Sequence, residues 1–301
     1  MELKLCFVNC ILKLMTLFNT LSNLNLKLKI NLNINTMEIK NKYVLITGAT
    51  SGIGYELAKL FAQNGYHLVI VSRNHERLQE KANEFKKFGI KVVTMSKNLF
   101  KEDDVFSLYA ELKLNNISPE ILVNDAGQGV YGKFEDTDIH RELDIVNLNI
   151  NSVLILTKLF IKDRSGKGSG KILNLASIAS KAPGPWHSVY HGTKAFILSW
   201  SEAIREELKD SGITVTALLP GPTDTDFFNK ANMNNSKILE DSNNLSSPEE
   251  VAKDGYDALM NGDDKVISGM KNKLTAAMAN LVSDSMAAHR MGEMQKPVEK
   301  N

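Results

Sequence analysis

From Met37 to the end of the chain, short runs of apolar, often β-branched residues alternate with longer segments in which apolar residues recur every three or four positions. The short runs are typical of buried strands and the longer segments of amphipathic helices. The runs predict seven strands, near residues 43–47, 67–72, 91–95, 121–123, 170–175, 213–218 and 265–268. Strands that alternate with helices favour an α/β fold, with a parallel sheet and helices on both faces, in one domain. Ligands of such sheets bind beyond the carboxyl ends of the strands, so the chemistry is expected in the loops that follow each run.

The first 36 residues follow a different pattern and carry a net charge of +3, from four lysines and one glutamate. Apolar residues recur at helical spacing over residues 3–18 and alternate strictly with polar residues over 23–35. Three interpretations remain open: a translated upstream leader with Met37 as the true start, a peripheral or organellar segment, and a cleaved secretory signal, for which a small-residue cleavage site is missing. We therefore treat residues 1–36 as a poorly ordered N-terminal extension and residues 37–301 as a single domain.

Composition limits the class of protein further. Of the 301 residues 43% are hydrophobic, enough for a large core, and a net charge of +1 gives no electrostatic case for nucleic acid or an anionic membrane as the main partner. Cys6 and Cys10 are the only cysteines, so we expect a reducing, cytoplasmic setting, with organellar or peripheral membrane targeting left open by the first 36 residues. Lys4 and Lys13 interrupt the longest apolar run, so no membrane-spanning helix is expected.

A glycine-rich turn follows the first predicted strand directly and leads into a helical segment. Counted from Thr47, its glycines are spaced as TGxxxGxG. Glycines let the chain turn tightly and approach a pyrophosphate, while the amino end of the next helix supplies free N–H groups and the positive end of a dipole. The turn therefore predicts a dinucleotide site formed by Gly48, Thr50, Ser51, Gly52, Ile53 and Gly54.

Further motifs follow the glycine turn along the chain. They are Asn124-Asp125-Ala126-Gly127, Ser177, Tyr190-x-x-x-Lys194 and Pro220-Gly221-Pro222. Together, at these intervals, they resemble the short-chain dehydrogenase/reductase family over about residues 40–270, and residues 127–134 and 201–203 resemble its DltE-like branch. The resemblance implies a doubly wound, Rossmann-type sheet of seven parallel strands in the order 3-2-1-4-5-6-7, a nicotinamide cofactor, and the interconversion of a carbonyl and an alcohol.

The residue after the second predicted strand indicates which nicotinamide cofactor is used. An acid there would accept hydrogen bonds from the ribose hydroxyls of NAD, whereas a base would pair with the 2′-phosphate of NADP. Arg73 follows this strand, and its planar guanidinium suits a phosphate, so we expect NADP(H) rather than NAD(H). A solvated Arg73 at the start of the next helix is the alternative, because Ser51 is not the basic residue that often reinforces phosphate binding in the family. By resemblance, Asn98 and Leu99 lie near the adenine.

Tyr190 and Lys194 are four residues apart and share one face of a predicted helix. A tyrosine with its ordinary pKa of ~10 is a poor proton shuttle at neutral pH, and a neighbouring ammonium group would lower that pKa. Ser177 follows the fifth predicted strand, 13 residues before Tyr190, which puts its hydroxyl at the carboxyl end of the sheet. By resemblance, Ser177 binds the substrate oxygen, Tyr190 transfers the proton, and Lys194 lowers the tyrosine pKa and binds the ribose.

Asn149 is the candidate for a fourth catalytic position, because the family carries an asparagine in this helix. The helical stretch 139–161 contains Asn147, Asn149 and Asn151. At helical spacing Asn149 lies on the apolar face, whereas the other two lie on the polar face. A buried asparagine needs hydrogen-bond partners, which fits a role in holding a water against Lys194 in a proton relay. An asparagine bonded only to backbone is the alternative.

Two more loops are expected at the cofactor. The loop after the fourth predicted strand contributes Asn124, Ala126 and Gly127, and the loop after the sixth contributes Pro220, Gly221, Thr223 and Thr225. Asp125 stands where the family usually has a second asparagine, which puts one hydrogen bond in doubt because an ionised carboxylate cannot donate. For Thr223 and Thr225, capping of their own turn is the alternative.

Aromatic side chains predict an apolar substrate pocket of unknown size. They are Tyr131, Phe134, Trp186, Phe227 and Phe228. His187 is expected on the wall of this pocket rather than in acid–base chemistry. No HExxH motif or paired Cys/His cluster occurs in the sequence, so no catalytic metal is expected.

These patterns predict an NADP(H)-dependent oxidoreductase that acts on a small, mostly apolar carbonyl or alcohol. A 3-oxoacyl carrier-protein reductase is the nearest enzymatic alternative, and a lyase or epimerase that uses the cofactor transiently is a further one. From another class, a non-catalytic cofactor-sensing protein remains open, although the intact set of Ser177, Tyr190 and Lys194 argues against it. By resemblance, the helices that carry Asn149 and Tyr190 form a subunit interface, which implies a homodimer or homotetramer.

Overall fold

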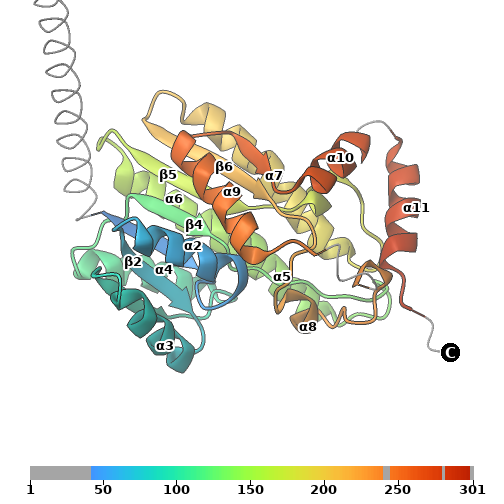
Figure 1. Cartoon of the computed structure of the whole chain (residues 1–301), viewed down its shortest axis with the longest axis horizontal. Coiled ribbons are helices and arrows are strands. Elements are labelled where there is room, and N and C mark those ends of the chain that lie inside the picture. Colours follow the sequence, from blue (N-terminus) through green and yellow to red (C-terminus); the bar gives the residue numbers. More distant parts are fainter. Residues whose placement is uncertain (1–41, 240–244, 280–281, 299–301) are drawn as a thin grey trace, which may run out of the picture. The chain divides into compact units, whose positions relative to one another are not determined.

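One continuous parallel sheet organises the computed structural model, which describes residues 42–239, 245–279 and 282–298 (Figure 1). Its strands are β1 (Tyr43–Thr47), β2 (His67–Ser72), β3 (Val92–Ser96), β4 (Ile121–Asn124), β5 (Gly170–Leu175), β6 (Ile213–Leu219) and β7 (Lys265–Ile267). Their order across the sheet is β3-β2-β1-β4-β5-β6-β7, which confirms the predicted fold class and strand order. The predicted strand ends agree to within one residue. The extension predicted at residues 1–36 lies outside the described residues.

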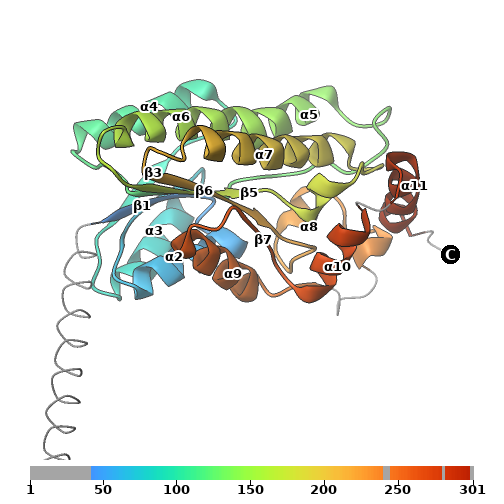
Figure 2. The same ribbon diagram turned by 90° about the horizontal axis from the view of Figure 1, so that it is seen from above.

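Helices cover both faces of the sheet. On one face lie α2 (Gly52–Gln63), α3 (His75–Lys86) and α9 (Pro248–Asn261), and on the other lie α4 (Glu102–Leu114), α6 (Ser152–Arg164) and α7 (Ser188–Glu207) (Figure 2). The other helical segments are α5 (Ile139–Val146), the π-helical turn η1 (Asn147–Asn151), the 3-10 turns η2 (Ile178–Lys181) and η3 (Lys237–Leu239), α8 (Phe227–Lys230), α10 (Met270–Ala279) and α11 (Asp284–Gln295). Because both faces are covered, the central strands read as unbroken apolar runs rather than alternating ones.

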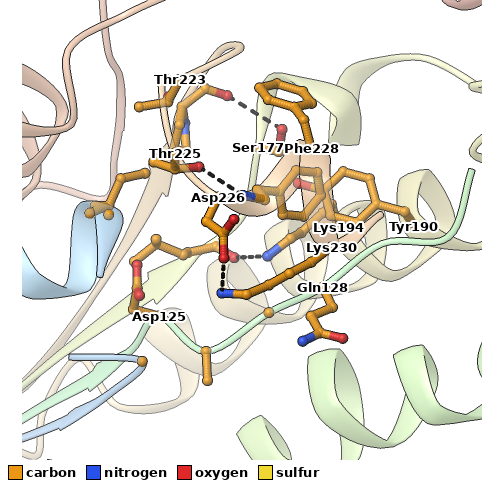
Figure 3. Close-up of a pocket in the computed structure, with 18 of the residues that line it drawn as sticks. Asp125, Gln128, Ser177, Tyr190, Lys194, Thr223, Thr225, Asp226, Phe228 and Lys230 are labelled. Carbon is orange, nitrogen blue, oxygen red and sulfur yellow. Dashed lines mark hydrogen bonds and ion pairs between the residues drawn. The ribbon is translucent and has the colours of Figure 1, made fainter. Parts of the chain in front are cut away.

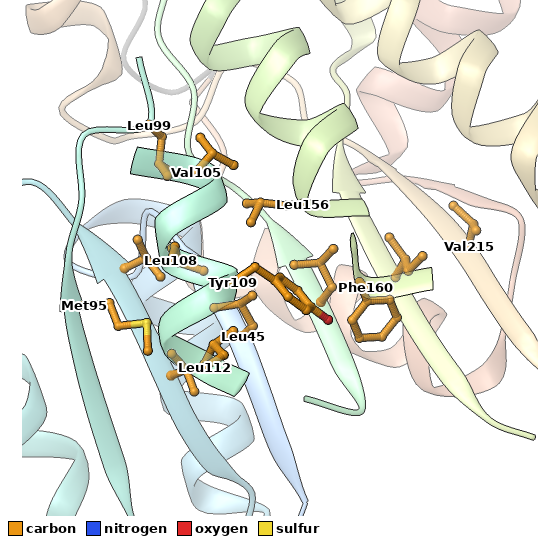
Figure 4. Packing of buried hydrophobic residues seen from close by; sticks show 14 of the residues in the cluster. Leu45, Met95, Leu99, Val105, Leu108, Tyr109, Leu112, Leu156, Phe160 and Val215 are labelled. Carbon is orange, nitrogen blue, oxygen red and sulfur yellow. The ribbon is translucent and has the colours of Figure 1, made fainter. Parts of the chain in front are cut away.

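A buried apolar cluster lies between the sheet and the helices α4 and α6 (Figure 4). Phe160 of α6, Leu108 and Leu112 of α4, and Leu45 of β1 are fully buried in it. Interiors of this kind are close-packed, so side chains interlock and the backbone beneath them is held in place. The packing therefore fixes the carboxyl ends of the strands, from which the loops of the site begin.

The continuous helical stretch Ile139–Arg164 is, within the described residues, long and apolar enough to cross a membrane. The core helix of a globular domain passes the same test of length and composition. Here Leu156 and Phe160 of this stretch are buried against the sheet as part of the core cluster. The stretch is thus a core helix in this fold and gives only weak evidence for a membrane span.

Candidate active site

A cavity of about 290 Å³ opens at the carboxyl ends of the strands. Its wall is formed by the loops after β1, β2, β4 and β5, by the start of α7, by the segment after β6 and by α11. Ser177, Tyr190 and Lys194 all line it, and Figure 3 shows them close to one another. In the part of the chain that the structure describes, no group of three or more His, Cys, Asp and Glu residues could hold a metal ion.

The glycine turn between β1 and α2 is shaped for close approach. Gly48 and Gly52 have φ angles of 76° and 58°, which residues with a side chain rarely adopt. A Cβ on Gly54 would lie 2.3 Å from Oδ2 of Asp125 and 2.7 Å from the carbonyl oxygen of Gly48, so no larger residue fits there. Ser51 precedes α2 without a side-chain cap bond, which leaves N–H groups at the helix start for an anion. Of the predicted contacts, Gly48, Thr50, Ser51, Gly52 and Ile53 line the cavity, whereas Gly54 lies behind them.

Arg73 lines the cavity where β2 ends. Its guanidinium lies 4.7 Å from the centroid of the Phe100 ring, which orients its planar face. Lys97 also lines the cavity here, and its Nζ lies 2.9 Å from a carboxylate oxygen of Glu111. Arg73 and Lys97 are thus the two cations of this part of the cavity wall, and Lys97 is already ion-paired.

Asn98 and Leu99, which the resemblance placed near the adenine, lie differently in the structure. Leu99 lines the cavity and Asn98 does not. The Asn98 side-chain oxygen accepts a hydrogen bond from the N–H of Phe100 at 3.3 Å, and the backbone N–H of Asn98 donates to the Asp104 carboxylate at 2.7 Å. Asn98 therefore shapes the loop after β3 through local hydrogen bonds.

Ser177 and Tyr190 reach the cavity wall from two elements, the end of β5 and the first turn of α7. The Ser177 hydroxyl accepts from the N–H of Ala179 at 3.1 Å and donates to the carbonyl of Pro220 at 3.3 Å, so its position is fixed. Burial raises the pKa of Tyr190 to about 12, and a hydrogen bond with Ser177 acts in the opposite direction. The His187 ring stacks on Tyr190, with centroids 4.4 Å apart and planes 12° apart. Burial also lowers the pKa of His187 to about 3, so it is neutral at ordinary pH.

Lys194 lies beneath the Tyr190 ring, with its Nζ 5.7 Å from the ring centroid. Its ammonium donates a hydrogen bond to the carbonyl of Leu175 at 2.7 Å, and the residue is only 7% exposed. Burial lowers the pKa of Lys194 to about 8, while the Asp125 carboxylate opposes this shift. The ammonium therefore remains mostly protonated at neutral pH and lies close enough to stabilise a phenolate on Tyr190.

Asn149 lies in the π-helical turn that joins α5 to α6, a feature that the helical period alone does not predict. Its side chain is 2% exposed, in agreement with the apolar face deduced from the sequence. Its Nδ2 donates to the carbonyl of Gln128 at 2.9 Å and to Oγ1 of Thr193 at 3.0 Å, and its Oδ1 accepts from the N–H of Gln128 at 3.1 Å. The side chain thus ties the loop after β4 to α7.

Asn149 and Lys194 approach the same glycine. A Cβ on Gly127 would lie 3.4 Å from Oδ1 of Asn149 and 3.5 Å from Nζ of Lys194. Asn149 itself does not line the cavity. Both N–H groups of its amide are engaged, by Gln128 and Thr193. Its Oδ1 accepts one hydrogen bond and can accept a second, and the π turn displaces its main chain from the ordinary helical ladder.

The loop after β4 is held from below by two side chains. Oγ1 of Thr47 accepts from the N–H groups of Asp125 and Ala126, both at 3.1 Å. Asn124, expected beside the cofactor, is buried beneath the loop and does not line the cavity. Its Nδ2 donates to Asn174 at 2.8 Å and to Thr157 at 3.1 Å, which links β4 to β5 and α6. Asn124 therefore supports the loop, and Ala126 and Gly127 form its cavity face.

Asp125 packs its carboxyl group under the glycine turn and lines the cavity. Burial raises the pKa of Asp125 to about 7, while the Lys194 ammonium and the N–H of Gly54 act to lower it. At neutral pH the carboxyl group is therefore partly protonated. The sequence argument, which treated it as an ionised acceptor, missed that it can donate a hydrogen bond as well.

The segment after β6 covers the glycine turn. Pro220, Gly221, Thr223 and Thr225 all line the cavity. Oγ1 of Thr223 donates to the carbonyl of Gly221 at 2.9 Å, and Oγ1 of Thr225 accepts from the N–H of Phe227 at 3.3 Å. Both threonines thus cap their own turn, which was the alternative interpretation of the sequence. A Cβ on Gly52 would lie 3.0 Å from Cγ2 of Thr225, so this segment touches the turn directly.

The aromatic pocket expected from the sequence is only partly present. Phe227, Phe228 and His187 line the cavity. The expectation was wrong for Tyr131, Phe134 and Trp186, which do not line the cavity. Tyr131 and Trp186 stack on each other with ring centroids 6.2 Å apart, and Phe134 is 62% exposed. The sequence also missed several lining residues, namely His191, Met233, Ile238, Met291 and Gln295.

Met291 and Gln295 belong to α11, about 100 residues after Tyr190 in the chain. Their spacing of four residues puts them on one helix face, and this spacing is the only sequence signal that they act together. That signal does not say which surface the face covers. Only the folded arrangement of α11 beside the cavity reveals it.

Known proteins resemble this chain in sequence and in fold. The family model for short chain dehydrogenases matches residues 42–236. The chain is 28% identical over 244 residues to the ketoacyl reductase HetN of Nostoc sp., across 80% of this chain and 79% of that protein. It is 32% identical over 209 residues to an uncharacterized oxidoreductase of Staphylococcus epidermidis, across 68% of this chain and 88% of that protein.

A solved structure, the short-chain dehydrogenase from Sphingobium yanoikuyae in complex with NADPH, matches with a TM-score of 0.70 and 28% identity, over 81% of this chain and 95% of that one. The fold, the cavity and these relatives agree on one assignment. The chain belongs to the short-chain dehydrogenase family and is a nicotinamide-dependent oxidoreductase that interconverts a carbonyl and an alcohol.

Proposed function

We propose that the protein is an NADP(H)-dependent oxidoreductase for a small, mostly apolar carbonyl or alcohol, with Ser177, Tyr190, Lys194 and Asn149 as its catalytic set. The observation that carries the proposal is the meeting of a fixed serine hydroxyl, a tyrosine and a buried ammonium group on one cavity wall. A protein that only binds the cofactor and catalyses no reaction would not need these three groups together, so the non-catalytic alternative is disfavoured.

Ser177, Tyr190 and Lys194 each have a separate role in the reaction. Ser177 hydrogen-bonds the substrate oxygen, because its hydroxyl lines the cavity and can turn its O–H to that oxygen from the Pro220 carbonyl, 3.3 Å away. Tyr190 gives its proton to that oxygen in reduction and takes it back in oxidation. Lys194 stabilises the phenolate that forms, which is needed because burial raises the pKa of Tyr190 to about 12. When bound, the nicotinamide supplies or accepts the hydride.

Asn149 acts at the rear of this set. Its side chain locks the loop of Gln128 against α7, and the π turn around it disturbs the regular backbone bonding near Lys194. We assign it the role of positioning a water that returns protons to Lys194 through the main chain of the turn.

NADP(H) is the proposed cofactor. The glycine turn and the start of α2 would hold the pyrophosphate, and Arg73 would hold the 2′-phosphate. The absence of a carboxylate among the described lining residues at the end of β2 supports this choice, because an acid there would repel the phosphate. The S. yanoikuyae relative, solved with NADPH, lends further support.

The catalytic assignment is tested with Tyr190→Phe. This variant should lose turnover by a factor of about a thousand or more while it still binds NADPH, since proton transfer is lost and the cavity shape is kept. Tyr256→Phe, on α9 and away from the cavity, is the matched control. Turnover of Tyr190→Phe comparable to that of the control would overturn the assignment.

Cofactor choice is tested with Arg73→Ala. Loss of a charge-assisted bond to phosphate should lower kcat/KM for NADPH about tenfold to a hundredfold and leave kcat/KM for NADH nearly unchanged. Arg77→Ala, which removes an exposed arginine of α3 outside the cavity, should change neither value. A wild-type preference for NADH would contradict the proposal.

A 3-oxoacyl thioester is the second candidate substrate, because the Nostoc relative is a ketoacyl reductase. Reduction of acetoacetyl thioesters at rates above those for simple ketones would favour it. We further propose a homodimer or homotetramer, since Ile139 and Leu143 of α5 and Phe196 of α7 expose 54%, 52% and 38% of their surface. Light scattering that shows only monomer at micromolar concentration would contradict this.

A further inference from the structure

The C-terminal helix α11 supplies a polar side chain to the active-site cavity that none of the proposed catalytic steps uses. Gln295 lines the same cavity as Ser177 and Tyr190 and is 4% exposed. Its Nε2 lies 2.9 Å from Nε2 of His191, the residue next to Tyr190 in α7. The last turn of α11 is therefore in direct contact with the helix that carries the proposed proton donor.

The direction of this hydrogen bond follows from the other side of the imidazole. Nδ1 of His191 lies 2.8 Å from the carbonyl oxygen of Ala182, which can only accept, so Nδ1 carries the proton. Burial lowers the pKa of His191, which keeps the ring neutral and leaves Nε2 as an acceptor. The amide nitrogen of Gln295 must therefore face His191, and its oxygen Oε1 must face away.

The backbone around Gln295 holds the side chain in this position. The carbonyl of Gln295 accepts hydrogen bonds from the Tyr131 hydroxyl and, at 3.0 Å, from the Ser236 hydroxyl. The next residue, Lys296, accepts from the N–H of Lys237 at 3.1 Å. Two separate segments, at Tyr131 and at Ser236 and Lys237, thus hold the end of α11, and Gln295 cannot turn its amide without losing the bond to His191.

Oε1 of Gln295 is left buried with no hydrogen-bond donor among the described residues. A buried acceptor without a partner is unfavourable, so such atoms in native proteins usually mark a place where a ligand or a water binds. Gln295 is part of the cavity wall, so a molecule in the cavity can supply the donor. Its polar partner would lie in the same cavity as the reacting carbonyl, because Gln295 and Tyr190 both line that cavity.

We propose that Gln295 is a specificity-determining residue whose Oε1 accepts a hydrogen bond from a hydroxyl or amide N–H group of the substrate, distinct from the carbonyl that reacts. The inference rests on the proposed function and narrows its substrate class. The substrate has an apolar body, suited to Met233, Ile238 and Met291 on the cavity wall, and one additional hydrogen-bond donor. A plain hydrocarbon ketone leaves the Gln295 acceptor unpaired.

Matched ketones test the proposal. The probes are methyl ketones of increasing chain length and the same ketones with a terminal hydroxyl group, each reduced with NADPH. At the best-fitting chain length, kcat/KM of wild-type protein should be about tenfold or more higher for the hydroxylated ketone than for the plain one. The reason is that a plain ketone leaves the buried acceptor of Gln295 without a hydrogen bond. In Gln295→Met, which has a similar volume and no acceptor, that ratio should fall to about one.

Met294→Leu is the control variant, because Met294 is an exposed neighbour on α11 outside the cavity, and it should keep the wild-type ratio. A wild-type ratio near one, a preference that persists in Gln295→Met, or an equal loss for both ketones would overturn the proposal. The first result would mean that an internal water satisfies Oε1, the second that another residue sets the preference, and the third that Gln295 only supports the fold.

Calorimetry separates this inference from the proposed function. Dissociation constants of each ketone pair for the protein–NADPH complex report on Gln295 whether or not reduction follows. Reduction of the plain ketones without a binding preference would leave the proposed function standing and remove the inference. A binding preference that Gln295→Met abolishes, without any reduction, would support the inference and remove the proposed function.

Discussion

Replacing Lys194 by methionine should shift the pH profile of alcohol oxidation to higher pH and slow the reaction at neutral pH. The deprotonated Tyr190 accepts the alcohol proton in this direction, so its pKa governs the rate. Burial raises that pKa to about 12, and the Lys194 ammonium, 5.7 Å from the ring centroid, favours the charged form. Methionine keeps the length of the side chain and removes this charge.

The structure gives a magnitude for the effect. Nζ of Lys194 lies 5.7 Å from the centroid of the Tyr190 ring, and two unit charges at that separation, at an effective dielectric constant of about 20, attract by about 3 kcal/mol. Since 1.36 kcal/mol corresponds to one pH unit, Lys194 should lower the tyrosine pKa by about two units. Bringing the pKa from about 12 to near neutrality takes roughly 7 kcal/mol; the hydrogen bond with Ser177 is already part of the value of about 12, so the remainder must come from the charge of the bound cofactor.

The assay is kcat for alcohol oxidation at saturating cofactor and alcohol, measured over pH 6 to 11. In Lys194→Met the midpoint of the profile should rise by about two pH units, and kcat at pH 7 should fall about a hundredfold. Lys181→Met, which removes a lysine of η2 outside the cavity, serves as control and should leave the profile in place. An unchanged midpoint in Lys194→Met would refute the electrostatic argument.

Three further predictions concern the glycine turn, the buried carboxyl group and the core. Gly54→Ala should weaken NADPH binding by at least about tenfold in a fluorescence titration, because the new Cβ would lie 2.3 Å from Oδ2 of Asp125; unchanged affinity would show that the turn can relax. Folding raises the pKa of Asp125 from 3.8 to about 7. Ionisation of this carboxyl group therefore lowers the free energy of unfolding as the pH rises from about 4 to 7, by up to about 4 kcal/mol. Asp125→Asn should therefore raise the melting temperature relative to wild type more at pH 8 than at pH 5, and a pH-independent difference would contradict this. Phe160→Ala should lower the free energy of unfolding by about 3–5 kcal/mol in denaturant titrations, since Phe160 is fully buried, and a loss below about 1 kcal/mol would mean that its neighbours collapse into the space.

Local patterns in the sequence were enough to predict the sheet and the approximate position of the site. Buried parallel strands are covered on both faces, so each appears as a short apolar run between polar loops. All parallel strands end at the same edge, so Ser177 after β5 and the glycine turn after β1 had to lie near one another. Tyr190 and Lys194 share a helix face for the simple reason that they are four residues apart.

Other features depend on contacts between distant segments and could not be read in this way. The π turn at Asn147–Asn151 breaks the regular helical period, and Asn149 within it is held by Gln128 and Thr193, which belong to other elements. The raised pKa of Asp125 comes from burial under the glycine turn. The misplaced aromatics Tyr131 and Trp186 pair with each other instead of facing the cavity.

The sequence by itself therefore determined the fold class, the strand order through the family resemblance, and the residues expected to react. Those properties are carried by residues close together in the chain or by the common edge of a parallel sheet. Only the tertiary structure decided which groups are buried, how their pKa values move, and that α11 brings Gln295 to the active site. Burial and long-range contact depend on how separate elements pack, and no local pattern of residues records that packing.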